Sequence, residues 1–160
     1  MHQMPYCAWA KIEIGGTITT SKLSELLLAV SEDYKEDLAD EISLASREGR
    51  IAVFEDDDVP YGRFSFTESL TMHGLFYRSV NSSNTGVHSL CEYGSPDGTV
   101  VVGENNEFAS IPVREVVDAY VSGRMAELVA KYDDFLKPLP SLCILAENDA
   151  DLPGVPNFAL

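Results

Sequence analysis

The 160-residue sequence has few basic residues, few histidines and few cysteines. It contains 11 Lys and Arg against 26 Asp and Glu, a net charge of −15, and only three His and three Cys. A surface this negative repels nucleic-acid phosphates and anionic lipids, so direct binding to DNA, RNA or a membrane is not expected. Attraction to a cation or to a basic protein surface is allowed, although acid excess also simply keeps small proteins soluble.

The sequence also lacks long apolar runs and a secretory leader. No apolar run approaches the ~20 residues needed to cross a bilayer, and the start, MHQMPYCAWAKIEIGG, has no signal-peptide pattern. The cysteines, Cys7, Cys91 and Cys143, are odd in number and widely spaced, which does not suit a disulfide framework. We therefore predict a cytoplasmic protein with reduced, mostly buried thiols, and we expect Cys7 and Cys143 in the core because their neighbours are apolar.

What remains is the composition of a globular domain, with 45% apolar and 23% charged residues. Periodicity and turn residues predict the order β α α β α β β β α α β. This order favours an α+β class: a mainly antiparallel sheet of five to six strands, with helices packed on one face and a ferredoxin-like, split βαβ arrangement as the preferred topology. We predict one domain over residues 1–145 and a loosely ordered acidic tail over residues 146–160.

Local patterns predict which faces of these elements are buried. Residues 8–14 alternate as a strand, with Ile12 and Ile14 on the apolar face. Ser21 is the expected N-cap of a first helix, a second helix covers 36–48, and Gly49 is its expected stop. A later helix over 111–123 carries an apolar stripe that we expect to be buried, made of Val113, Val116, Val117, Tyr120 and Val121.

The stretch RIAVFEDDDVPYG, residues 50–62, places four consecutive acids after a short apolar run. A calcium loop needs acids at alternate positions and Gly at the sixth, but counting from Asp56 a proline and a tyrosine occupy the fifth and sixth positions. The acids are therefore interpreted as an exposed loop at a strand end, because like charges repel and seek water. The alternative is a cation-dependent hydrolase that uses Asp56 and Asp58 with His73 or His88.

Other catalytic and cofactor motifs are weak. No G-x-S-x-G elbow occurs, and Gly15-Gly16 is not followed by a P-loop or dinucleotide-binding pattern. His88 and Cys91 are three residues apart on a predicted strand, so their side chains point to opposite faces. Zinc would need a second pair of ligands, which the sequence does not offer. We predict no catalytic residue, no metal site and no cofactor.

Binding through charge is the hypothesis that remains strongest. Acids spaced three and four residues apart share a face of the 36–48 helix, and a row of carboxylates suits a groove that binds phosphates. We predict a non-enzymatic acidic binding protein that contacts a basic protein surface, with a nucleic-acid-mimicking inhibitor of the phage or mobile-element type as its sharper form. A structural assembly subunit with an apolar interface, for instance near Trp9, is a further alternative. The predicted partner-binding residues are Glu36, Asp37, Asp40, Glu41, Glu55, Asp56, Asp57 and Asp58.

Overall fold

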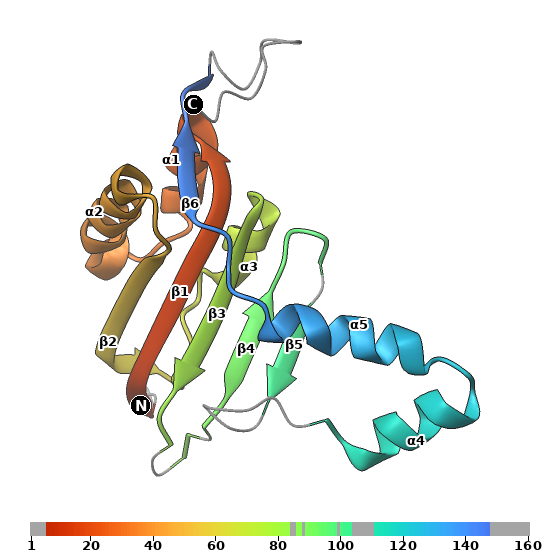
Figure 1. Ribbon diagram of the computed structural model, residues 1–160. Helices are drawn as coiled ribbons and strands as arrows, with labels where there is room; N and C mark the ends of the chain where they lie inside the picture. Colours follow the sequence, from red (N-terminus) through yellow and green to blue (C-terminus); the bar gives the residue numbers. More distant parts are fainter. Residues whose placement is uncertain (1–5, 84–85, 88, 99, 104–110, 148–160) are drawn as a thin grey trace, which may run out of the picture.

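The computed structural model describes residues 6–83, 86–87, 89–98, 100–103 and 111–147 (Figure 1). Its strands and helices confirm the predicted α+β class and the predicted element order. In chain order they are β1 (Cys7–Thr19), α1 (Thr20–Leu28), α2 (Glu32–Glu48), β2 (Ala52–Pro60), α3 (Thr67–Met72), β3 (Leu75–Asn81), β4 (Cys91–Gly94), β5 (Val100–Gly103), α4 (Val113–Val121), α5 (Met125–Leu136) and β6 (Leu142–Leu145).

The sheet has the strand order β2-β1-β3-β4-β5, and neighbouring strands on this path run antiparallel. β6 joins β1 in parallel, alongside Gly16–Thr19, beyond the end of the β1–β2 pairing. β2 and β3 are parallel to each other on either side of β1, with α3 between them in the chain. This is one split βαβ unit, and the full ferredoxin-like topology remains a prediction.

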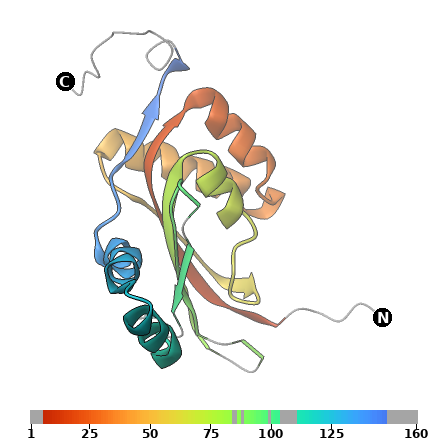
Figure 2. The same cartoon turned by 90° about the vertical axis from the view of Figure 1, so that its right-hand side faces the viewer.

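The main core lies between the sheet and the first three helices. Leu26 of α1, Leu38 of α2 and Leu70 of α3 are fully buried and belong to one cluster with Ile12 and Ile14 of β1. Helices α4 and α5 lie on the other side of the sheet from α1 and α3 (Figure 2). There Tyr132 of α5 packs on a smaller cluster around Cys91 and Tyr93 of β4.

Strand β1 confirms the predicted alternation, because its residues from Cys7 to Ile14 are alternately half-buried and buried. Its two glycines allow another segment to approach. A Cβ on Gly15 would lie 1.9 Å from the carbonyl oxygen of Pro140, and Gly16 has a positive φ of 107°. The Gly15-Gly16 pair therefore admits the chain that leads from α5 to β6, which is a packing role.

Helix ends differ from the prediction at α1 and agree at α2. The N-cap of α1 is Thr19, whose side chain accepts from the Lys22 N–H, and not the predicted Ser21. Ser31 caps α2, so this helix begins four residues before the predicted residue 36. Gly49 ends α2 in the left-handed conformation with φ of 67°, as predicted.

The acids after residue 54 are not in a strand-end loop, and this prediction is wrong. They continue β2, whose pairing with β1 extends from Ala52 to Pro60. The physical reason is that β2 lies at the edge of the sheet, where charged side chains remain in water while the backbone still pairs on one side.

The prediction that helix 111–123 buries its valine stripe is also wrong. Val113, Val117, Tyr120 and Val121 are 78%, 51%, 77% and 80% exposed, and only Val116 of the predicted stripe is half-buried. α4 packs mainly against α5, through the buried Ala119, because the helical hairpin leads away from the sheet (Figure 1). No part of the sheet is therefore available to cover the outer face of α4.

Burial of the cysteines follows the prediction only in part. Cys91 is buried and Cys7 is half-buried, whereas Cys143 is exposed, so its assignment to the core is wrong. None of the three forms a disulfide. Among the described residues, no helix combines the length and apolar character that crossing a membrane would require. His88 and most of the predicted acidic tail, from residue 148 onward, lie outside the described residues.

Candidate functional site

Helix α2 presents a row of unpaired carboxylates to solvent. Its apolar stripe, Leu38, Ile42 and Ala45, is fully buried against the sheet, which turns the opposite face outward. Glu36, Asp37 and Asp40 are exposed on that outer side. Within the described residues, no hydrogen bond or ion pair engages these three side chains. Their charges are therefore available to a partner.

Glu41, which was predicted together with these acids, has a structural role. Its carboxylate accepts from Arg50 at 2.6 Å and from the backbone N–H of Val53 at 2.9 Å. The hydrogen bond from Arg50, more than any other contact, lowers the pKa of Glu41. Glu41 thus joins α2 to the start of the edge strand β2, and it is not a free partner-binding charge.

The acids of β2 point to two faces of the sheet. Glu55 pairs with Lys11 and Asp56 pairs with Ala10, and directly opposed residues share a face. Asp56 is therefore on the side of the sheet that forms the main core with α1, α2 and α3, while Glu55 is on the opposite side. Two residues of β2, Asp57 and Asp58, then lie opposite one residue of β1, Trp9, which makes a bulge. The run does not form one carboxylate cluster.

Two of these four acids accept hydrogen bonds from other side chains. Asp56 hydrogen-bonds the Tyr34 hydroxyl, and burial together with this bond raises the pKa of Tyr34 to about 12. Asp58 hydrogen-bonds the Cys7 thiol, whose pKa burial and Asp58 both raise. Glu55 and Asp57 are exposed and have no such neighbour among the described residues. Charges and a bulge along an edge strand also prevent another strand from pairing there.

Of the hydrolase alternative, the structure describes Asp56, Asp58 and His73, whereas His88 lies outside the described residues. His73 lies at the end of α3, where its ring contacts the Ser69 carbonyl at 2.7 Å and Glu25 of α1 at 3.4 Å. It is not brought to Asp56 and Asp58. Among the described residues, no group of three or more His, Cys, Asp or Glu side chains is arranged to hold a metal ion.

A buried polar network was missed by the sequence analysis. Glu92 of β4, only 8% exposed, accepts a short hydrogen bond from the Tyr77 hydroxyl and a second, of 3.1 Å, from Arg63. Burial, and then this bond to Glu92, raises the pKa of Tyr77. The adjacent cavity of about 20 Å³ has room for little more than one water. The network therefore holds the loop after β2 against β4.

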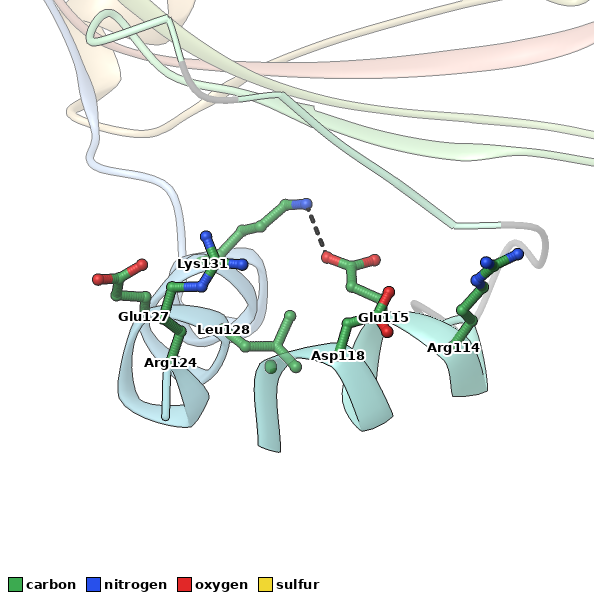
Figure 3. A pocket seen from close by; sticks show the side chains of 8 residues that line it. Arg114, Glu115, Asp118, Arg124, Glu127, Leu128 and Lys131 are labelled. Atoms are coloured by element: carbon green, nitrogen blue, oxygen red, sulfur yellow. Dashed lines mark hydrogen bonds and ion pairs between the residues drawn. The ribbon is translucent and has the colours of Figure 1, made fainter. Parts of the chain in front are cut away.

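A cavity of about 480 Å³ lies between α4 and α5 (Figure 3). Its polar lining is electrically balanced. Glu115 and Lys131 reach toward each other at 3.1 Å, and Tyr132 also donates to Glu115. The charged residues that line it are Arg114, Arg124, Lys131, Glu115, Asp118 and Glu127.

Comparison with known proteins identifies no relative: no protein family, curated protein or solved structure matches the chain significantly. The candidate site is therefore defined by geometry alone. It consists of the free α2 acids Glu36, Asp37 and Asp40, together with Glu55 and Asp57 on the neighbouring edge strand, where Glu55 faces the side of the sheet opposite to α2. We call these five residues the acidic edge.

Proposed function

We propose that this protein is a non-enzymatic binding protein whose acidic edge contacts a basic surface of another protein. The observation that supports this most strongly is the concentration of uncompensated charge on two packed, adjacent elements. Residues 32–58, which include α2 and β2, contain eleven acidic and three basic side chains. Two of the three basic side chains, Lys35 and Arg50, already pair with acids of the same region.

A rigid helix is a suitable carrier for such a row of charges. The exposed acids from Asp33 to Asp40 extend about 10 Å along α2, at 1.5 Å per residue. This length equals the rise of about three phosphates along one strand of DNA. A basic groove that binds nucleic acid would therefore meet a similar density of negative charge. In its sharper form, the proposal is that the protein occupies such a groove and inhibits its owner.

Salt and competition test the proposal. Proteins retained on DNA-cellulose would be passed over the immobilised full chain at increasing salt concentration, with duplex DNA as competitor. We expect that rising salt steeply weakens the captured complex and that duplex DNA displaces the bound protein. The salt effect follows because interactions between surface charges are screened beyond about 8–10 Å at ionic strengths of about 0.1–0.15 M. Failure to retain any protein, or retention that neither salt nor DNA reduces, contradicts the proposal.

A charge-matched pair of variants localises the surface. Reversal of Glu36, Asp37 and Asp40 to Lys should weaken capture at least tenfold, which is about 1.4 kcal/mol. Glu41 is left intact because it holds α2 to β2. The control reverses three other exposed acids, Glu68, Glu127 and Glu147, and changes the net charge equally. If both variants lose binding equally, the effect belongs to net charge and not to the acidic edge.

A further inference from the structure

The outer face of α4 is an apolar surface that the described part of the chain leaves in water. Val113, Val117, Tyr120 and Val121 follow the spacing i, i+4, i+7 and i+8 and form one continuous stripe. This stripe lies opposite Ala119, the residue through which α4 packs on α5. All four side chains are at least half exposed. Such a stripe on a projecting helix indicates an interface.

Two charged residues border this stripe on one side. Arg114 and Asp118 are four residues apart on one flank of α4, and both line the cavity that α4 shares with α5 (Figure 3). The structure gives neither side chain an ion-pair partner among the described residues. The border of the apolar stripe thus has one positive and one negative charge available for contact.

We propose that this face is the interface of a two-fold symmetric dimer in which α4 packs antiparallel on α4 of a second copy. A two-fold axis near Val117 places the same border of both helices together in reversed order. Arg114 of each copy then faces Asp118 of the other, while the apolar stripes meet between them. The border is therefore complementary to itself in the antiparallel arrangement.

The charge of the rest of the molecule favours this location for self-association. Residues 113–136 contain three basic and five acidic side chains, against three and eleven in residues 32–58. Two copies can therefore approach at the hairpin without the repulsion that the acidic edge would cause. Because the hairpin leads away from the sheet, contact there also leaves the acidic edge of both copies accessible (Figure 1).

The size of the surface sets the expected strength. α4 is nine residues long, about 13 Å, so two such helices bury less than the roughly 800 Å² per partner of a standard interface. We therefore expect a reversible dimer with a Kd on the order of 10 μM. Dimerisation would be visible as a concentration-dependent mass and not as a permanent assembly.

Sedimentation of the full chain over a concentration series measures this mass. Wild type should change from monomer to dimer, and Val117→Glu should remain monomeric because it places two carboxylates at the two-fold axis. Leu28→Glu is the matched control: Leu28 is 81% exposed on α1, away from the hairpin, and its change should leave the dimer intact. Circular dichroism of both variants confirms that they fold.

Charge exchange tests the antiparallel geometry itself. Arg114→Asp or Asp118→Arg alone should weaken the dimer at least tenfold, since each places like charges opposite one another. The double variant, R114D with D118R, should restore it, because the exchanged charges again face each other. A wild-type chain that stays monomeric overturns the proposal, even if the α4 face then binds zwitterionic vesicles or another protein. A dimer that the double variant does not restore overturns the antiparallel pairing.

Discussion

The α2–β2 region and the α4–α5 hairpin are built from similar amphipathic helices but present opposite surfaces to solvent. α2 buries its apolar stripe against the sheet and exposes acids to solvent. α4 fully buries only Ala119 and exposes Val113, Val117 and Val121. The difference does not come from the helices alone. It comes from their position, since α2 lies over the sheet and α4 lies beyond it (Figure 1).

The two proposals assign two kinds of contact, one charged and one apolar, to two different surfaces of the same chain. A charged surface favours rapid, salt-sensitive encounters with an oppositely charged partner. An apolar stripe with a self-complementary border favours a copy of the same chain. The two proposals made above place these contacts on different elements, so a variant of one surface should leave the other working.

Core truncation should distinguish the two regions most strongly. Leu38→Ala in α2 removes a fully buried side chain and should lower the free energy of unfolding by about 2–5 kcal/mol. Val121→Ala in α4 removes an 80% exposed side chain and should change it by less than about 0.5 kcal/mol. Urea denaturation at low protein concentration, where the chain is monomeric, measures both. Equal losses would mean that the α4 face is covered within the monomer.

The connection between the regions should be sensitive at Gly15. Gly15→Ala would place a methyl group 1.9 Å from the Pro140 carbonyl oxygen and displace the segment between α5 and β6, at a cost of about 3 kcal/mol. Gly123→Ala, inside the hairpin, meets no atom within 4 Å and should cost only the backbone strain of its positive φ, about 1 kcal/mol. Thermal denaturation compares them. If the Gly123 variant loses as much stability as the Gly15 variant, the close approach of the Pro140 carbonyl to Gly15 does not contribute to stability.

Neighbouring acids of α2 should behave differently from each other. Glu41→Ala leaves the Val53 N–H and Arg50 without their acceptor and should cost about 1–2 kcal/mol. Asp40→Ala, on the exposed face, should cost almost nothing. Because the folded pKa of Glu41 is lowered, its contribution is present above the ordinary carboxyl pKa and is lost as the pH falls through the folded value. The gap between the two variants should therefore close in acid, and a gap that persists there would contradict this assignment.

Tyr34 should give the smallest effect, a loss of stability in alkali. Its folded pKa of about 12 lies above the ordinary tyrosine value, so the protonated form stabilises the fold. That contribution is complete below about pH 10 and disappears as the pH rises toward 12. The stability difference between wild type and Tyr34→Phe should change across this interval. A stability difference that stays constant across this interval would refute the raised pKa that burial and Asp56 give Tyr34.

Local patterns in the sequence predicted most of the fold. The alternation around Ile12 and Ile14 and the stop at Gly49 were confirmed, because backbone period and glycine conformation are properties of short segments. Asp37, Asp40 and Glu41 were predicted to share one helix face by their spacing, and of these Asp37 and Asp40 are exposed. These features need no knowledge of distant residues.

Errors occurred where a distant element decides the environment. The valine stripe of α4 has the pattern of a buried face, but no sheet reaches it. Glu41 has the pattern of an exposed acid, but Arg50 and Val53 engage it after the chain has turned back. The Tyr77–Glu92 network joins residues fifteen positions apart on two strands, so no short sequence motif predicts it.

The sequence by itself determined the element order, the faces of β1 and α2, and the large surplus of negative charge. Only the tertiary structure decided which acids remain free, how β2 divides its carboxylates between two faces, and why an apolar stripe is exposed on α4. The physical reason is that periodicity sets which side chains share a face, whereas burial and pairing depend on which other element that face meets.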